Sequence, residues 1–293
     1  MKNQIVGMGE ALWDLLPEGA KVGGAPANFA FHMSQFGYHA FAVSAVGKDE
    51  LGRNLLDKFA EKGLKTLIPQ VGFPTGTVQV TLDEQGVPQY EITGNVAWDN
   101  VPFTEQLAQV AVGTQCVCFG SLAQRSETTR LTINRFLDLM PKNALKVFDI
   151  NLRQQFYSEE VLRESMQRCN ILKINDEEAL VVSHLFHYEL DDLPAVCLRL
   201  KSEYALDTVI LTCGVNGSYV FYDKGYSFLY TPRVTVADTV GAGDSFTAGF
   251  CASRLCGKSI PEAHAVAVET SAFVCTQQGA MPPLPQEILD RLR

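Results

Sequence analysis

Residues 238–244 read Asp-Thr-Val-Gly-Ala-Gly-Asp, and they stand between a β-rich run and a stretch with helical periodicity. The first four N–H groups of a helix have no partner within it, and the helix dipole makes that end partly positive. Because glycine has no side chain, the backbone of Gly241, Ala242 and Gly243 can approach an anion closely. The stretch therefore predicts an anion-binding turn that opens a helix.

Asp244 follows directly, on the first turn of this helix. A carboxylate beside a bound phosphate would repel it, unless the carboxylate takes a proton from a hydroxyl that attacks the phosphorus. The alternative is a glycine-rich turn in which Asp244 only caps the helix, which is a common arrangement. The residues of this stretch alone leave both interpretations open.

A second glycine pair stands in Gly23-Gly24-Ala25-Pro26-Ala27-Asn28. Pro26 suits the first position of a helix, where its missing N–H costs nothing. The glycines again bring bare backbone near a helix start, and Asn28 offers both a donor and an acceptor to a sugar hydroxyl. An ordinary loop with a helix cap is the alternative interpretation.

Composition narrows the class of protein. The chain has 293 residues, and its net charge of −9 argues against a general nucleic-acid binder, which needs a basic face. No run of about 18 apolar residues occurs, so no membrane span is expected. The N-terminus shows no secretory pattern, and the eight cysteines include no Cys-x-x-Cys pair. We expect a cytoplasmic protein with reduced thiols and no zinc site.

The stretch at 238–244 resembles the C-terminal signature of the ribokinase-like, or PfkB-type, carbohydrate kinases, and 23–28 resembles the N-terminal signature of the same family. The resemblance implies that Gly241, Ala242 and Gly243 form the anion hole for the transferred phosphoryl group. It implies that Asp244 is the catalytic base. The same resemblance implies a sugar-binding role for Gly23, Gly24, Asn28 and Asp244.

Strands and helices alternate from residue 116 onward, which predicts a parallel sheet with helices on both faces. With the resemblance, this predicts one α/β domain over residues 1–293, a ribokinase-like three-layer sandwich with a mainly parallel central sheet. Residues 77–82 and 88–93 alternate as a hairpin. The resemblance implies a small β-sheet lid over the sugar, formed by about 10–22 and 74–99, which would exclude water.

Further site residues follow from the resemblance. It implies that Asp14 and Trp98 contact the sugar, although Trp98 is equally suited to the core at a domain edge. Ligands of such sheets gather at the carboxyl ends of strands, where Asp149-Ile150-Asn151-Leu152-Arg153 is expected. Arg153 offers a forked cation to a phosphate or a sugar oxygen, and the resemblance favours this over an ordinary surface arginine.

Nucleotide and metal residues are also implied by the resemblance. Asn175 and Glu178 match the family's Asn-x-x-Glu motif for magnesium and phosphate, with Mg²⁺ held by Glu178 through water. From the residues alone, Glu178 equally completes an acidic first helical turn. A potassium ion would lie on backbone carbonyls near Asp238. The implied ATP-binding residues are Asn175, Thr212, Gly214, Gly217, Gly241, Gly243 and Gly279.

The predicted function is an ATP-dependent sugar kinase, with a fructokinase that phosphorylates O6 of D-fructose as the first choice. This choice rests on the resemblance of Gly9–Asp14, Ala25–Asn28 and Ala97–Asp99 to fructokinases. The alternatives are a ribokinase, a 2-keto-3-deoxygluconate kinase, or a silent sugar- or nucleotide-binding protein on the same fold. We expect a small sugar as the partner, and the exposed edge strands of the lid suggest a homodimer.

Overall fold

In the residues that the computed structural model describes (4–16, 19–82 and 88–292), the largest sheet has nine strands in the order β15-β14-β13-β12-β11-β10-β1-β4-β6. All neighbouring strands are parallel except the β13–β14 and β14–β15 pairs, which are antiparallel. This confirms the mainly parallel central sheet. Its strands are β1 (Gln4–Met8), β4 (His39–Val43), β6 (Lys65–Leu67), β10 (Thr114–Phe119), β11 (Leu145–Asp149), β12 (Ile171–Asn175), β13 (Thr208–Thr212), β14 (Ser218–Tyr222) and β15 (Gly225–Leu229).

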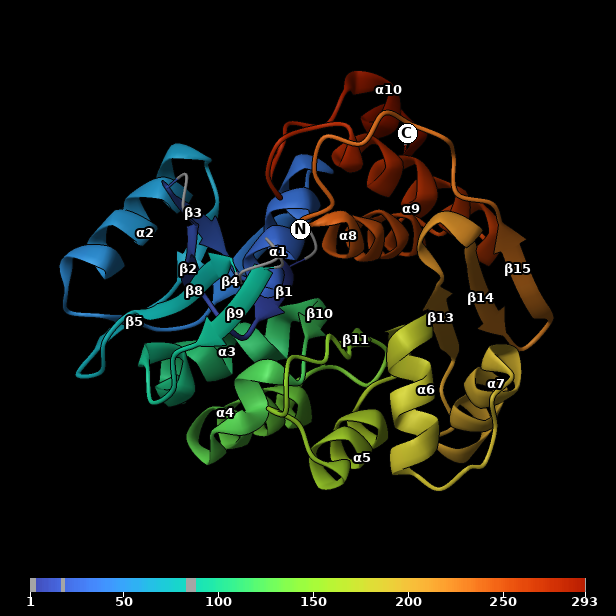
Figure 1. Ribbon diagram of the computed structural model, residues 1–293, viewed down its shortest axis with the longest axis horizontal. Helices are drawn as coiled ribbons and strands as arrows, with labels where there is room; N and C mark the ends of the chain where they lie inside the picture. Colours follow the sequence, from blue (N-terminus) through green and yellow to red (C-terminus); the bar gives the residue numbers. More distant parts are fainter. Residues whose placement is uncertain (1–3, 17–18, 83–87, 293) are drawn as a thin grey trace.

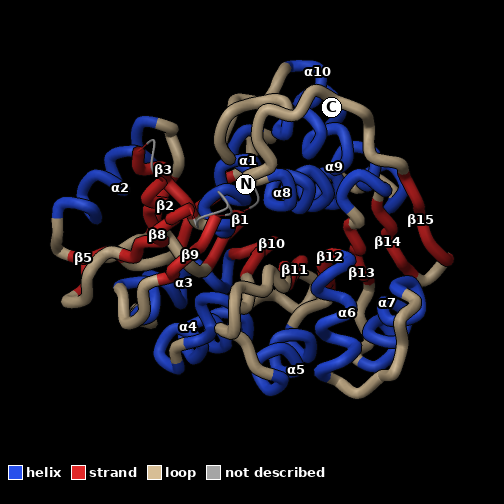
Figure 2. Tube along the Cα trace, viewed as in Figure 1, coloured by secondary structure: helices blue, strands red, loops and turns tan. Residues whose placement is uncertain are grey.

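Helices cover both faces of this sheet (Figure 1). One face carries α1 (Ala25–Gln35), α8 (Ala242–Leu255), α9 (Ile260–Cys275) and the short α10 (Gln286–Leu289). The other carries α3 (Glu105–Gly113), α4 (Glu127–Leu139), α5 (Glu159–Arg168), α6 (Asp176–Leu185) and α7 (Leu193–Glu203). Successive residues of β1 face opposite ways, so Ile5 belongs to one hydrophobic core and Val6 to the other. The three-layer sandwich is confirmed (Figure 2).

A second, four-stranded sheet stands beside the central one, in the order β3-β2-β8-β9. It contains the expected hairpin as β8 (Gly76–Leu82) and β9 (Pro88–Ile92), whose tip at 83–87 lies outside the described residues. The N-terminal segment joins it as β2 (Leu12–Leu16) and β3 (Gly19–Gly23), with β2 parallel to β8. This small sheet therefore unites two distant parts of the chain.

A short segment connects the two sheets. Strand β4 ends at Val43, and residues 46–47 pair in a separate two-stranded sheet of β5 (Val46–Gly47) and β7 (Gln70–Val71). Helix α2 (Glu50–Glu61) follows, capped by the Asp49 side chain. The Asp49 carboxylate also accepts bonds from the N–H and hydroxyl of Thr75 at 2.8 and 2.6 Å, and so fixes the entry to β8.

Two further properties follow from the described residues. No helix in 4–16, 19–82 or 88–292 has the length and apolar character that a bilayer crossing requires. All eight cysteines are free thiols, and most of them are buried.

Candidate active site

The site begins at the N-terminus of α8. Gly241 is the N-cap and has a left-handed backbone, with φ of 78°. A Cβ at this position would lie 2.7 Å from the Cα of Ala280, so only glycine fits without a shift. The preceding residues 234–237, which looked extended in the sequence, form no strand. The turn into the helix agrees with the sequence-based prediction.

Asp244 lies on the first turn of α8 and is held by helix α1. Asn28 donates a hydrogen bond from Nδ2 to Oδ2 of Asp244 at 2.8 Å. Asn28 itself is buried. Gly24 caps α1 with φ of 125°, and the helix starts at Ala25, one residue before the expected Pro26. The two glycine segments of the sequence therefore meet at one carboxylate.

A buried ion pair supports the same helix end from the central sheet. Nζ of Lys173 on β12 lies 2.9 Å from both carboxylate oxygens of Asp149 on β11. Thr247 on α8 donates to Asp149 at 3.1 Å. Nζ of Lys173 would lie 3.1 Å from a Cβ on Gly243, so the ammonium reaches the glycine turn. The ammonium of Lys173 thus lies beside the helix N-terminus, where an anion is favoured, and the Asp149 carboxylate balances its charge.

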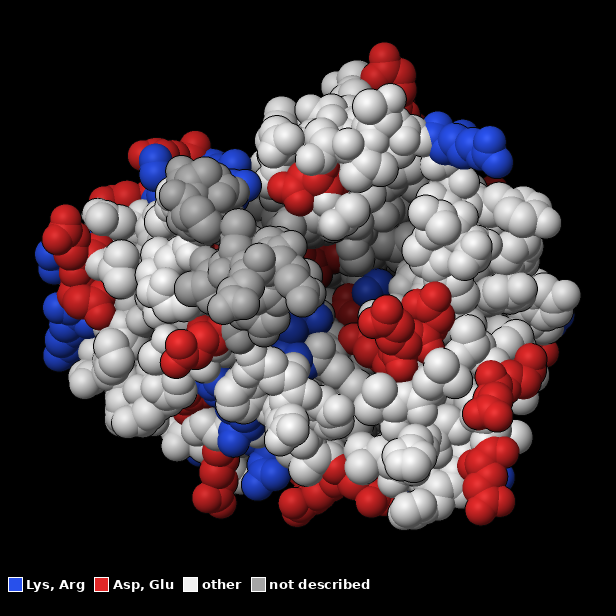
Figure 3. Space-filling model, viewed as in Figure 1, with Lys and Arg blue, Asp and Glu red and all other residues white. Residues whose placement is uncertain are grey.

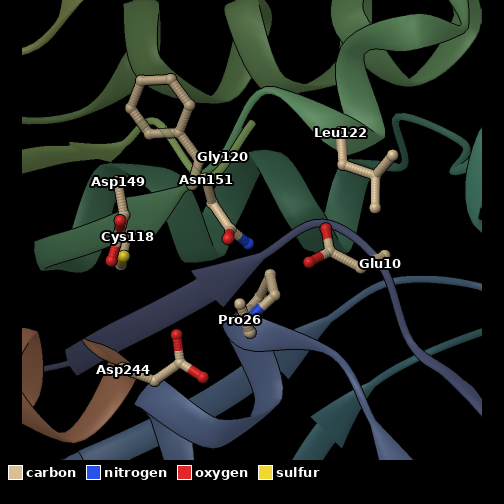
Figure 4. A pocket seen from close by; sticks show the side chains of 10 residues that line it. Glu10, Pro26, Cys118, Gly120, Leu122, Asp149, Asn151 and Asp244 are labelled. Carbon is tan, nitrogen blue, oxygen red and sulfur yellow. The ribbon is translucent and has the colours of Figure 1, made fainter. Parts of the chain in front are cut away.

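Four polar side chains line one small cavity: Glu10, Asp149, Asn151 and Asp244 (Figure 4). Its free space is about 10 Å³, which is close to the room needed by one water molecule. Figure 3 shows that the face of the molecule in this view is hollowed near its middle, with acidic side chains along one rim.

Burial alters the ionisation of the carboxyl groups in this cavity. Burial and then the charge of Asp149 raise the pKa of Asp244 to about 6, against the bond from Asn28 and the charges of Lys173 and Arg153. Burial raises the pKa of Glu10 to about 7, with a smaller contribution from Asp244. A carboxylate with a pKa near 6 is ionised at neutral pH and still basic enough to accept a proton in a transition state.

The activity should therefore depend on pH through Asp244. Because the base must be ionised, we expect kcat at saturating substrates to fall about tenfold per pH unit below the pKa of about 6. Since Glu10 has a pKa of about 7 in the same cavity, the profile is repeated with Glu10→Gln, which should keep the limb near pH 6. A rate that stays level down to pH 5 would contradict a base with this pKa.

Three of the predicted sugar-contacting residues, Asp14, Gly23 and Arg153, are described by their own contacts. A Cβ on Gly23 would lie 2.5 Å from Oδ2 of Asp14, so the Asp14 carboxylate lies directly on Gly23. Burial raises the pKa of Asp14, while Arg153 and Lys21 oppose the rise. Arg153 is exposed and donates to the carbonyl of Leu152 at 3.0 Å. Its charge lowers the pKa of three carboxyl groups, so it faces the same space.

The predicted nucleotide residues form a second group at neighbouring strand ends. Asn175 ends β12 beside Thr212, which ends β13. Asn175 and Glu178 form a reciprocal capping box at the start of α6. The Glu178 carboxylate also accepts the N–H of Leu152 at 2.9 Å, which ties this helix to the loop that carries Arg153.

The remaining predicted residues lie in turns. Gly214 and Gly217 flank a single helical turn after β13 and have φ of 51° and 111°. Gly279 has φ of 75° and donates its N–H to Oδ2 of Asp238 at 3.1 Å. The carboxylate of Asp238 thus joins the segment before α8 to the segment after α9.

The residues predicted for magnesium do not form a site made of protein side chains alone. Among the described residues, no three His, Cys, Asp or Glu side chains cluster as a metal cage. The oxygens of Glu178 accept backbone N–H groups of Leu152 and Asn175. Such residues fit an ion that is carried by nucleotide phosphates and reached through water, which is the usual manner for Mg²⁺.

Trp98 differs from the other predicted sugar-contacting residues in its burial. Trp98 is fully buried in the core. The guanidinium carbon of Arg125 lies 4.0 Å from the centre of its ring, and Gly76 packs against the ring edge. Arg125 in turn binds the buried carboxylate of Asp99 at 2.8 Å. Of the two interpretations from sequence, the structure favours the core residue at a domain edge.

Glu10 and Lys173 were not predicted as site residues, and Asn151 was expected only as part of the segment 149–153. A lysine within the apolar run Ile171–Ile174 is the signal that could have revealed Lys173, since an unpaired charge does not stay in such a strand. Asn151 has a left-handed backbone with φ of 43°, a strained conformation that often marks functional loops. Sequence alone does not show that strain.

A glycine-rich helix start, a buried carboxyl group with a raised pKa and a polar cavity are the features expected of a kinase that acts on a hydroxyl group. The comparison with family models identifies the family: residues 19–287 match the pfkB family carbohydrate kinases, and the chain belongs to this family. It is therefore an ATP-dependent sugar phosphotransferase, and a silent binding protein is the weaker alternative.

The relatives agree on the class and differ in substrate. The chain is 27% identical to the fructokinase of Salmonella typhimurium, over 96% of this chain and 95% of that protein. It is 26% identical to the ATP-dependent 6-phosphofructokinase of Thermoanaerobacterium thermosaccharolyticum, over 90% and 81%. A fructokinase double mutant of Vibrio cholerae O395 with fructose, ADP and potassium bound superposes with a TM-score of 0.82. It is 21% identical and covers 100% of this chain and 99% of that one, which shows the shared fold.

Proposed function

We propose that this protein is a fructokinase that transfers the γ-phosphate of ATP to O6 of D-fructose. The observation that carries the proposal is the 2.8 Å hydrogen bond from Asn28 to Asp244, because it joins the two residues to which we assign sugar binding and proton removal. Asn28 fixes the orientation of the carboxylate. Asp244 then removes the proton from the hydroxyl as its oxygen attacks the phosphorus.

The proposed role of the glycine turn is to bind the phosphoryl group that leaves ATP. We infer that the N–H groups of residues 241–243 bind the transferring phosphoryl group, and that the N–H of Ala242 then gives up or shares its 3.3 Å bond to the carbonyl of Thr239. The ion pair of Lys173 and Asp149 lies beside this turn. Charge that develops on the phosphoryl oxygens is thereby stabilised by groups that are already in place. Mg²⁺ on the nucleotide would neutralise further phosphate charge, with Glu178 and Asn175 nearby to hold its waters.

Fructose is preferred to a phosphorylated sugar for an electrostatic reason. The cavity is lined by the carboxyl groups of Glu10, Asp149 and Asp244, and the ammonium of Lys173 is already paired with Asp149. A phosphate on the acceptor would meet these like charges, with Arg153 as the opposing cation. The fructokinase relative of Salmonella supports the same choice, while ribose and 2-keto-3-deoxygluconate remain the alternatives.

A substrate screen tests the proposal. ADP release is coupled to a spectroscopic assay and measured with fructose, ribose, 2-keto-3-deoxygluconate and fructose 6-phosphate. We expect fructose to give the highest kcat/KM. A higher kcat/KM with any of the other three would replace the proposed substrate and leave the kinase class intact.

Four further expectations belong to this proposal. The small sheet β3-β2-β8-β9 is proposed as the lid, because Glu10 of the cavity lies two residues before β2 of this sheet. Potassium is proposed on carbonyls near Asp238, supported by the potassium in the Vibrio fructokinase. A homodimer through the edge strands β3 and β9 remains a prediction, as does a cytoplasmic location, which suits a protein that consumes ATP.

A further inference from the structure

Glu10 is a buried carboxyl group that the catalytic steps above do not use. It follows β1 and is 5% exposed. Its Oε2 is enclosed and has no hydrogen-bond partner among the described residues. Because a buried polar atom without a partner is costly, such an atom in a native structure usually awaits a ligand or a water molecule.

The surroundings hold Glu10 in place. A Cβ on Gly24 would lie 2.5 Å from the carbonyl oxygen of Glu10, so the backbone of the residue packs tightly against the start of α1. The backbone N–H groups of Glu10 and Ala25 bond its carboxyl group and oppose the rise of its pKa to about 7. One side of the carboxyl group is thus anchored, and the other side is free.

The free side faces the site cavity. Glu10 lines the cavity together with Asn151 and Asp244, and Figure 4 shows its carboxyl group and the Asn151 amide directed toward the same space above Pro26. Asp244 lies on the other side of Pro26 in this view. An acceptor oxygen in a cavity that also holds carboxylates suits a neutral hydroxyl and does not suit an anion.

We propose that Oε2 of Glu10 binds one sugar hydroxyl, other than the one that Asp244 deprotonates, and that Glu10 is a specificity-determining residue for the acceptor sugar. The proposal rests on the sugar kinase activity and uses fructose only as the first probe. It predicts that the enzyme distinguishes a sugar with this hydroxyl from the deoxy sugar without it. The competing account makes Glu10 a structural anchor for the start of α1 and nothing more.

Substrate analogues separate the two accounts. kcat/KM is measured for the best acceptor of the substrate screen and for its monodeoxy derivatives, each without one hydroxyl that is not phosphorylated. The enzymes are the native protein, Glu10→Gln and Glu10→Ala. In the native protein, loss of the bound hydroxyl should lower kcat/KM by about 10- to 150-fold, the range for hydrogen bonds to charged groups.

The coupling between residue and hydroxyl is the decisive result. Glu10→Ala should lower kcat/KM for the parent sugar by about the same factor as loss of the bound hydroxyl does in the native protein. With the deoxy sugar that lacks this hydroxyl, the native protein and Glu10→Ala should have nearly equal kcat/KM. Glu10→Gln keeps the shape of the side chain and should show the same pattern with smaller losses. If both variants lower kcat/KM for the parent and for every deoxy sugar by the same factor, Glu10 is only an anchor and the proposal is wrong.

Three controls test whether the effects are specific to Glu10 and to the acceptor sugar. Glu105→Gln, on the exposed first turn of α3, makes the same change of charge and should leave all values unchanged. The KM for ATP should stay constant in the Glu10 variants. If the screen finds no fructose turnover, the deoxy series of the best sugar is used, so failure of the fructose assignment and failure of the Glu10 proposal give different results. If no sugar is phosphorylated, calorimetric binding of the same sugars replaces kcat/KM.

Discussion

Replacement of Asp244 by Asn should lower kcat by about 10²- to 10⁴-fold, the usual contribution of a positioned general base. The amide has the size of the carboxylate and can still accept the bond from Asn28 that the structure shows at 2.8 Å. It cannot take a proton from the attacking hydroxyl. The sugar should therefore bind with nearly unchanged affinity, and only the chemical step should slow.

Two measurements check this expectation. kcat is obtained from ADP release at saturating substrates, and sugar affinity is obtained by isothermal titration calorimetry without ATP. Asp207→Asn makes the same chemical change at an exposed position before β13 and serves as the control. Equal losses of binding and turnover in Asp244→Asn would assign this residue a structural role and remove the basis of the proposed chemistry.

The parts of the site that sequence could predict are those with a local pattern. The Gly-Ala-Gly turn and the Gly-Gly segment before Asn28 each combine glycine with a helix start, and both lie where the pattern indicated. The alternation of strands and helices likewise predicted the parallel sheet, because buried strands are short and apolar.

The parts that sequence missed depend on neighbours distant in the chain. Lys173 and Asp149 are 24 positions apart, and they pair because β11 and β12 are adjacent in the sheet. Glu10 was named only as part of the segment Gly9–Asp14, and its burial to 5% exposure becomes visible only in the fold. Trp98 remained ambiguous for the same reason, since burial is set by Arg125 and Gly76 from other segments.

A second large effect on kcat is expected from a substitution in the glycine turn. Gly241→Ala should lower kcat by about 10²- to 10³-fold, the cost of one misplaced donor in an oxyanion-type site. The new methyl group would meet the Cα of Ala280 at 2.7 Å, so the turn must move. Since the amides of residues 241–243 are carried by this turn, they would lose their alignment with the phosphoryl group. The KM for the sugar should change much less, because Asn28 and Gly24 lie on a different helix.

The other end of the same helix supplies the matched control. Gly257 has φ of 81°, close to the 78° of Gly241, and no described atom lies within 4 Å of where its Cβ would stand. Gly257→Ala therefore carries the same left-handed backbone cost of about 1–2 kcal/mol, without a collision and without a link to the phosphoryl site. Both variants should lose stability in urea unfolding, Gly241→Ala more because of its contact with Ala280, and only Gly241→Ala should lose kcat. A comparable loss of kcat in Gly257→Ala would mean that general destabilisation of α8, and not the position of the anion-binding amides, limits the reaction.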